Sequence, residues 1–471
     1  MAPTLFWYDL ETTGLDPIVD RPIQFAGVRT DMDLNPIESP VNIFSFPGDD
    51  VLPNPEAIMV TGLSMSQLRA SGSNEVEFCQ QIMSSFSKSE TCVVGYNNLK
   101  FDDEFVRQMF YRNFYNPYAR EWRNGNSRWD VIDMFRMAYA LRPDGIQWPK
   151  DDAGSVTFRL EELTRANDIE HSDAHDAVSD VLATINLTRL LRKAQPKLFE
   201  FFYALRKKDR VAKTLNLLDK KPVIHVSSLY GSKRSCISIV LPICEHPRNS
   251  NGVICCDLSL DPKEMIESTA MELYQLLFSS LDDRKARPYR MPLITLYMNR
   301  CPVIAPLTSM SDEDAIRLGI SISDCHANAL HLDNAIGLVE KIKTVFSERT
   351  FPLTDDPDRM LYQGAFFGIQ DEDLMEQLHE MQPEQLPELQ GQFQDPRLDE
   401  MLFRFRARNF AHVLSADEQK LWDRYRADRW EGGKSVKDIL EKTKKIQGKS
   451  QIPCLVDLVD YIENIIVGVS F

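Results

Sequence analysis

The first apolar segment of the chain runs into two acidic residues and then a glycine, in the order Leu5-Phe-Trp-Tyr-Asp9-Leu-Glu11-Thr-Thr-Gly14. Side chains alternate between the two faces of a strand, so Asp9 and Glu11 point to the same face, roughly 6 to 7 Å apart along the chain. Two like charges at that spacing need cations. Acidic pairs beside a turn are also common, so the segment predicts a strand-mounted metal site only if other residues complete it.

The chain has 471 residues, of which 43% are hydrophobic, and is too long for one ordinary core. No apolar stretch approaches the roughly 18 residues that a membrane span needs, and early acidic residues do not fit a signal peptide. Its nine cysteines are scattered without any Cys-x-x-Cys pair, which fits reduced thiols better than disulfides or zinc. We therefore expect a cytoplasmic protein of several domains.

The formal net charge of −16 is unevenly distributed along the chain. Residues 355–400 hold thirteen acidic residues and two arginines, a net charge of −11. Residues 104–142 carry seven arginines and four acidic residues (+3), and residues 189–213 carry nine basic and two acidic residues (+7). Because the field of a charge falls off over about 10 Å at ordinary salt, the two basic stretches could still bind a polyanion.

Three kinds of segment follow one another along the chain. Residues 1–194 alternate strand-like runs (5–10, 23–28 and 91–94) with helix-like segments (75–86, 103–111, 160–166 and 174–191), which predicts an α/β domain around a central sheet. Residues 195–348 contain β-branched runs at 222–226, 236–243, 253–258 and 293–303, which predict a small β-rich domain with a helix near 271–277. Residues 352–471 show helical periodicity and predict a third, helical domain.

A second polar segment follows the apolar run Cys92-Val-Val and reads Gly95-Tyr-Asn-Asn-Leu-Lys-Phe-Asp102-Asp-Glu. A strand ends there, a polar turn follows, and an acidic residue opens a helix. Asp102 is therefore a candidate partner for the first two carboxylates. Helix capping explains an acid at this position equally well.

A third segment, His171-Ser-Asp-Ala-His175-Asp-Ala-Val-Ser-Asp180, opens another helix. Asp180 lies beside the apolar stripe of that helix, where a free carboxylate is costly unless it is exposed or paired. His175 is near the helix start, where the helix dipole helps to keep the imidazole neutral and basic. A solvated acid and a surface histidine remain the structural alternatives.

The order Asp-x-Glu, then Asp, then His-x-x-x-x-Asp resembles the DEDDh 3′→5′ exonucleases. The strings Phe-Asp-Asp-Glu, Tyr-Arg-Asn-Phe-Tyr-Asn-Pro-Tyr and His-Ser-Asp-Ala-His-Asp-Ala are similar to the bacterial exonuclease I family. The resemblance implies a ribonuclease H-like exonuclease domain over residues 1–194, an SH3-like β-rich domain over 195–348 and a C-terminal helical domain over 352–471. Leu10 and Thr13 depart from that family, whose members carry aromatic residues there.

Phosphodiester hydrolysis must neutralise charge on the phosphoryl and leaving oxygens, which two cations about 3.5 to 4 Å apart can do. Mg²⁺ suits carboxylate ligands, and we expect Mn²⁺ to substitute. We assign the metals to Asp9, Glu11, Asp102 and Asp180. We expect His175 to activate the attacking water, since a neutral imidazole suits that task at pH 7.

Strand-binding residues are carried over from matching positions of the family. Glu11 is expected to touch the terminal 3′-hydroxyl and Thr12 to brace the last nucleotide. Guanidinium groups bind phosphates, and aromatic rings stack on bases with roughly 1 to 3 kcal/mol per base. The further expected contacts are Arg107, Tyr118, Trp122, Arg136 and Arg159, with Lys208 and Arg300 guiding the strand farther from the site.

The resemblance implies a Mg²⁺-dependent enzyme that degrades single-stranded DNA to 5′-mononucleotides, in DNA repair and recombination. It also implies docking of the C-terminal tail of a single-stranded DNA-binding protein. We expect a monomer that does not bind membranes. Two alternatives stay open: a 3′→5′ exoribonuclease, and a catalytically silent single-strand-binding scaffold. The sequence does not decide whether residues 355–400 repel duplex DNA or keep the protein soluble.

Overall fold

The computed structural model describes residues 2–171, 176–279, 290–449 and 452–468, and the chain forms two compact units. Unit 1 contains Met1–Ser127, His171–Leu182 and Leu353–Phe471, and unit 2 contains Arg128–Glu170 and Ala183–Pro352. The sheet at the start of the chain and the helices at its end therefore belong to one body. The two units are defined by packing and each combines separate parts of the chain. The domain boundaries predicted from the sequence, 1–194, 195–348 and 352–471, stay predictions.

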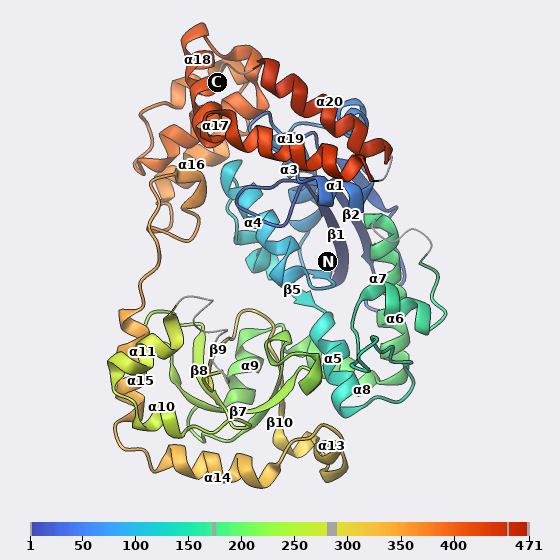
Figure 1. Ribbon diagram of the computed structural model, residues 1–471, viewed down its shortest axis with the longest axis vertical. Helices are drawn as coiled ribbons and strands as arrows, with labels where there is room; N and C mark the ends of the chain where they lie inside the picture. Colours follow the sequence, from blue (N-terminus) through green and yellow to red (C-terminus); the bar gives the residue numbers. More distant parts are fainter. Residues whose placement is uncertain (1, 172–175, 280–289, 450–451, 469–471) are drawn as a thin grey trace. The chain divides into compact units, whose positions relative to one another are not determined.

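Unit 1 has one sheet, with helices drawn from both halves of the chain (Figure 1). Its strands are β1 (Thr4–Thr12), β2 (Pro22–Thr30), β3 (Val41–Phe44) and β4 (Thr91–Gly95). Its helices are α1 (Pro55–Thr61), α2 (Met65–Ser71), α3 (Glu75–Phe86), α4 (Asp102–Arg112), α16 (Ile369–Leu378), α17 (Arg397–Asn409), α18 (Ala416–Arg429), α19 (Lys434–Gln447) and α20 (Pro453–Gly468). Two elements pass from one unit to the other, β5 (Ser127–Asp130) and α7 (Ala177–Ala194).

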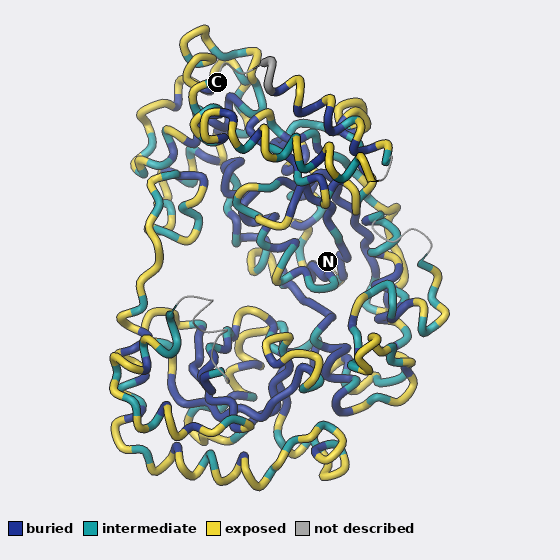
Figure 2. Tube along the Cα trace, in the orientation of Figure 1, coloured by how far each residue is buried: buried dark blue, intermediate teal, exposed yellow. Residues whose placement is uncertain are grey.

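Strand β1 is the centre of the first sheet. Within unit 1 the order is β3-β2-β1-β4, and β1 is antiparallel to β2 and parallel to β4. Both β1 and β2 are buried along nearly their whole length (Figure 2). Phe6, Tyr8 and Leu10 pack in one cluster with side chains of α3 and α4. Because side chains alternate, Asp9 and Glu11 lie on the opposite face of the strand.

The C-terminal helices complete the core of unit 1. One cluster joins Ile58 and Leu68 of α1 and α2 to Leu455, Leu458 and Ile462 of α20. A second cluster joins side chains of α3 and the end of α4 to side chains of α16 and α17. The helices α1, α2 and α3 and the end of α4 therefore pack against residues beyond position 370.

Unit 2 has a second sheet with its own core. Its strands are β6 (Val223–Val226), β7 (Ile237–Glu245), β8 (Gly252–Asp257), β9 (Leu293–Tyr297) and β10 (Val303–Pro306). They are ordered β10-β6-β7-β8-β9, all antiparallel. The helices are α5 (Ile132–Leu141), α6 (Leu160–Ala166), α8 (Pro196–Ala204), α9 (Lys208–Leu215), α10 (Lys263–Glu267), α11 (Ala270–Phe278), α13 (Asp312–Arg317), α14 (Ile322–Asp333) and α15 (Leu338–Glu348). Side chains of α11, α14 and α15 pack on β7 and β8 in one apolar cluster.

Most predicted elements are present, and one prediction is wrong. The helices predicted at 75–86 and 160–166 are confirmed as α3 and α6. The single strand predicted over 293–303 is instead two strands, β9 and β10, at opposite edges of the sheet. The break is at Cys301, whose φ of 46° is left-handed, and Pro302, which has no N–H to donate to a strand. In the part of the chain that the structure describes, no helix combines the length and apolarity needed to cross a membrane.

The joint core of unit 1 can be tested on α20. Leu458 is fully buried, whereas Val456 on the same helix is 44% exposed. We expect Leu458→Ala to lower the free energy of unfolding of unit 1 by about 3 kcal/mol, because it leaves a cavity in a packed core. The matched control Val456→Ala should cost less than about 0.5 kcal/mol. Urea unfolding measures both, and equal losses would contradict the joint core.

Candidate active site

Strand β1 and the start of α7 bring three carboxylates together. Asp9 pairs in register with Ala26 and Glu11 with Gln24, and the register shifts directly after Glu11. Asp180 lies in the first turn of α7. One carboxylate oxygen from each of Asp9, Glu11 and Asp180 lies within 4.8 Å of the others. The structure therefore gathers residues that the sequence separates by about 170 positions.

Asp102 is the fourth carboxylate, at the first position of α4. The backbone N–H of Leu10, between the two acidic residues of β1, donates a hydrogen bond of 3.2 Å to Asp102 Oδ1. The negative charge of Asp102 raises the pKa of Asp9, and the negative charge of Glu11 raises the pKa of Asp102. A backbone bond thus ties the start of α4 to the strand that carries the other acids.

Burial and mutual repulsion raise the pKa values of Asp9, Glu11 and Asp102. Burial first, and then the charges of Asp9, Asp180 and Asp176, together raise the pKa of Glu11 to about 9. The pKa of Asp9 is also raised well above its ordinary value, first by burial and then by Asp102, Asp180 and Asp176. Burial likewise raises the pKa of Asp102. Without cations, burial and repulsion therefore favour the protonated forms of these three groups.

The donor set suits a hard divalent cation. Carboxylate oxygens are the ligands that Mg²⁺ and Mn²⁺ prefer, and no sulfur or imidazole ligand belongs to the cluster among the described residues. Carboxyl groups that are protonated because their charged forms repel one another release those protons when a cation binds. The residues present therefore fit a divalent metal, with Asp9, Glu11, Asp180 and Asp102 available to hold it.

A buried set of polar groups lies behind the cluster. Tyr8 Oη donates a hydrogen bond of 2.5 Å to Asp103 Oδ1, and Arg120 Nη2 donates to the same oxygen at 2.7 Å. Tyr8 precedes Asp9, and Asp103 follows Asp102. The two elements that carry acidic ligands are thus joined a second time on the face that packs against α4.

Two polar residues near the cluster were not singled out by the sequence. Asp176 adds negative charge close to Asp9 and Glu11, and it accepts a hydrogen bond of 3.2 Å from Gln24 Nε2. His171 Nε2 is hydrogen-bonded to Asp180 Oδ1. Both residues belong to the string around His175, so the signal was present in the third motif. His175 itself lies outside the described residues, and its role as base stays a prediction.

Thr12 and the connection that follows it are tightly bonded. Thr12 is buried, and its Oγ1 donates to the carbonyl of Gly14 at 2.6 Å. Thr13 Oγ1 donates to Asp20 Oδ1 at 3.2 Å. A Cβ on Gly14 would lie 2.3 Å from the Asp20 carboxylate, which would have to shift to admit any other residue there. The role of Thr12 in bracing a nucleotide stays a prediction.

The predicted strand contacts in unit 1 differ in exposure. Arg107 is buried and paired with Glu104 at 2.7 Å and Glu121 at 2.8 Å, and its guanidinium lies over the Tyr118 ring. Trp122 is 63% exposed. Arg107 therefore already has carboxylate partners, whereas Trp122 is largely exposed, with the guanidinium of Arg123 over its ring.

The predicted contacts in unit 2 also differ. Arg136 is buried, paired with Asp133, and lies over the ring of Phe158. The side chain of Arg159 is 73% exposed. Lys208 and Arg300 are exposed as well, with Lys208 Nζ bonded to Asn251. All of these assignments stay predictions.

Comparison with protein families gives three matches that follow one another along the chain. Residues 6–188 match the family model described as Exonuclease, residues 206–348 the Exonuclease I SH3-like domain, and residues 355–465 the Exonuclease I C-terminal domain. These matches confirm the predicted order of an exonuclease domain, an SH3-like domain and a C-terminal domain.

Relatives and solved structures agree over most of the chain. Exodeoxyribonuclease I of Haemophilus influenzae is 42% identical over 91% of each chain, and that of Escherichia coli is 42% identical over 90% of this chain and 89% of its own. E. coli exonuclease I in complex with a dA16 oligonucleotide has a TM-score of 0.94 at 39% identity, covering 98% of this chain and all of its own. A structure described as SSB/Exonuclease I with an inhibitor has a TM-score of 0.91 at 38% identity, covering 99% and 100%.

The raised pKa values predict how stability depends on pH without metal. In the folded protein the pKa of Glu11 is about 9, whereas the ordinary pKa of a glutamate is 4.5. The folded state is then favoured at low pH, and this advantage is lost as pH rises from about 5 to 9. We expect the melting temperature in EDTA to fall over that range and to fall less in Mg²⁺, which replaces the protons.

Glu11→Gln supplies the control for this measurement, because an amide of the same shape does not titrate. Its melting temperature in EDTA should depend less on pH than that of the wild type. An equal fall in both proteins would contradict the raised pKa of Glu11.

Proposed function

Because this chain belongs to the exonuclease I family and is a nuclease, we propose that it removes 5′-mononucleotides from the 3′ end of single-stranded DNA. The observation that carries the proposal is the carboxylate cluster of Asp9, Glu11 and Asp180, within the segment that matches the Exonuclease family. A chain freed from catalysis has no physical need to gather buried like charges, which disfavours the silent scaffold.

We assign the chemistry to five side chains. Asp9, Glu11, Asp102 and Asp180 hold two Mg²⁺ ions, with Mn²⁺ as a substitute. When bound, such ions offset the charge that develops on the phosphoryl and leaving oxygens. The imidazole of His175 takes the proton from the attacking water, which requires its neutral form.

The strand end is held by residues around β1. Glu11 contacts the terminal 3′-hydroxyl, and Thr12 braces the last nucleotide. Trp122 is the best suited of the predicted aromatic contacts to stack on a base, because most of its surface is exposed. Arg159 is similarly suited to bind a phosphate, because its side chain is exposed. Its ion pair with Glu162 is long, at 3.8 Å.

The proposal extends to partners and setting. A dA16 oligonucleotide is bound in the E. coli exonuclease I structure, and a second structure is described as SSB/Exonuclease I. By similarity, this chain binds single-stranded DNA and the C-terminal tail of a single-stranded DNA-binding protein. We further propose that it acts as a monomer, in the cytoplasm, in DNA repair and recombination.

Asp9→Ala tests the metal assignment. With Mg²⁺ and 5′-labelled single-stranded DNA, wild type should shorten the strand from its 3′ end, and Asp9→Ala should lower the rate by more than about 100-fold, because one group of a preorganised site is lost. Gel analysis of the labelled products measures both rates. Asp33→Ala, an exposed turn acid of the same unit, should leave the rate unchanged.

The same assay separates the alternatives. Faster loss of labelled RNA than of DNA would favour the exoribonuclease. Strand binding by wild type without any cleavage would favour the scaffold. Full activity of Asp9→Ala would remove Asp9 from the metal site.

His175→Ala tests the base. Turnover should fall by about 100-fold or more, whereas the Kd for a DNA strand should stay within a factor of two, because the imidazole acts on water rather than on the strand. Fluorescence anisotropy measures binding beside the cleavage assay. His326→Ala, exposed on α14, serves as the matched control, and unchanged turnover of His175→Ala would remove His175 as the base.

A further inference from the structure

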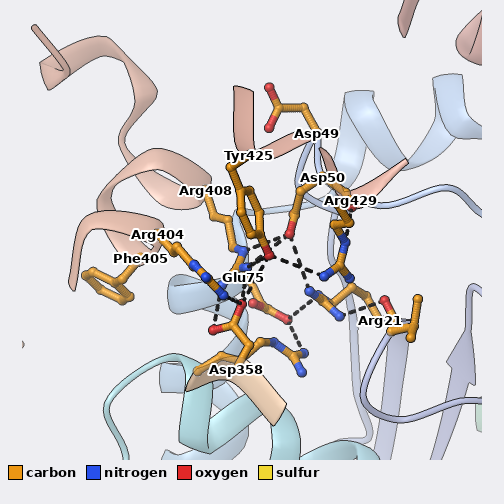
Figure 3. Close-up of polar contacts among 12 residues, drawn as sticks. Arg21, Asp49, Asp50, Glu75, Asp358, Arg404, Phe405, Arg408, Tyr425 and Arg429 are labelled. Atoms are coloured by element: carbon orange, nitrogen blue, oxygen red, sulfur yellow. Dashed lines mark hydrogen bonds and ion pairs between the residues drawn. The ribbon is translucent and has the colours of Figure 1, made fainter. Parts of the chain in front are cut away.

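A network of buried ion pairs joins the C-terminal helices of unit 1 to its N-terminal part (Figure 3). Arg408 Nη2 of α17 lies 3.0 Å from Asp50 Oδ2, and it also pairs with Asp358. Arg404 Nη1 lies 3.1 Å from Asp358 Oδ2. Asp50 and Asp358 are 1% and 3% exposed, so these pairs are shielded from water.

Arg21 extends the network to the connection between β1 and β2, residues 13–21, here named the β1–β2 turn. Its Nη2 lies 3.7 Å from Asp50 Oδ2. Its Nη1 donates to three carbonyls of the turn, those of Ile18, Val19 and Asp20, at 2.8 to 3.3 Å. The guanidinium therefore links the turn to Asp50: Nη1 binds the turn carbonyls, and Nη2 pairs with the Asp50 carboxylate.

The backbone of Arg21 closes the same turn. Its N–H donates to Thr13 Oγ1 at 2.9 Å, and its carbonyl accepts from the N–H of Thr13 at 2.9 Å. Thr13 follows Glu11 and Thr12 directly in the sequence. The position of Arg21 consequently fixes where β1 ends and where the turn begins.

A second branch of the network leads to α4. Glu75 Oε1 lies 3.5 Å from Arg21 Nε and 2.9 Å from Arg112 Nη2, and Asn113 Nδ2 donates to Glu75 Oε2 at 3.0 Å. Arg112 is the last residue of α4, and Asp102 is the first. The network thus touches both of the elements that carry acidic residues from the first two motifs.

Stability alone is a weak reason for such a network. Burying charged groups costs several kcal/mol per ion, and well-packed apolar side chains often stabilise a protein equally well. Burial alone would raise the pKa of Asp50, but Arg408 and Arg21 hold it well below its ordinary value. The groups therefore stay charged, and charged pairs of fixed geometry determine where the elements that carry them lie.

We propose that this network is a positioning device for the active site. Asp358 and Arg408, from the C-terminal segment, act through Asp50 and Arg21 to hold the β1–β2 turn, and with it Glu11 and Thr12, against the terminal nucleotide. The proposal rests on the proposed function, because it assumes that Glu11 and Thr12 contact the strand end. The four residues are assigned a positioning role and no contact with the strand.

Asp358→Asn tests the proposal because it removes the charge of a distant member and keeps its shape. The kcat for single-stranded DNA should fall by about tenfold while KM stays within about twofold, because misplacing a reacting end costs turnover rather than strand binding. The control is Asp371→Asn. Asp371 is equally buried in the C-terminal segment, accepts hydrogen bonds from the N–H groups of Gln394 and Asp395, and should keep the wild-type kcat.

Hydrogen exchange supplies a readout that does not depend on cleavage. Amides of residues 13–21 should exchange faster in Asp358→Asn than in wild type, and at the wild-type rate in Asp371→Asn. In Arg408→Lys, which keeps the charge but loses the forked geometry, the exchange rate of these amides should lie between those of wild type and Asp358→Asn. This variant replaces Asp358→Asn if the latter does not fold.

The outcomes separate this inference from the proposed function. Equal kcat in the two asparagine variants, or unchanged exchange of residues 13–21 in Asp358→Asn, would overturn the positioning role. Absence of cleavage by the wild type would overturn the proposed function, while faster exchange confined to Asp358→Asn would still support the link between the C-terminal segment and the turn.

Discussion

Repulsion among four carboxyl groups is the constraint on which the rest of unit 1 depends. The pKa values of Asp9, Glu11 and Asp102 are raised because burial removes hydration and because each group faces other acids. The fold supplies bonds that hold them in place despite this cost: Leu10 N–H to Asp102, and His171 to Asp180. The first two acids lie on β1, a central strand that is paired with β2 on one edge and with β4 on the other. Gathering these acids lowers the stability of the fold, and the apolar side chains that the helices of unit 1 bury offset this loss.

Local patterns predicted the parts of this arrangement that depend on local physics. The run before Asp9 predicted β1, and helical periodicity predicted α3 and α6 within their observed ends. The three acidic motifs predicted which carboxylates meet, because each follows a strand or opens a helix. Partners that lie far apart in sequence left no such pattern. The packing of the N-terminal part of unit 1 against the C-terminal helices could not be inferred from spacing.

Charge counted along the sequence proved a poor guide to charge at the surface. Arg107, Arg112 and Arg120 belong to the basic stretch 104–142, yet all three are buried and paired with carboxylates. In the acidic segment 355–400, Asp358 and Asp371 are buried partners of groups inside unit 1. Some of the charged side chains in both segments are therefore buried and paired inside the fold. Those arginines are not available to bind a nucleic acid.

The core shared by α1, α2 and α20 also has a consequence for the order of synthesis. A chain emerging from the ribosome carries Asp9, Glu11 and Asp102 long before it carries Leu455, Leu458 and Ile462, which bury Ile58 and Leu68. The half-made protein thus has these acidic residues before α1 and α2 have their packing partners on α20. The core of unit 1 is complete only once α20 has been synthesised, so unit 1 cannot finish folding while its N-terminal part is being made.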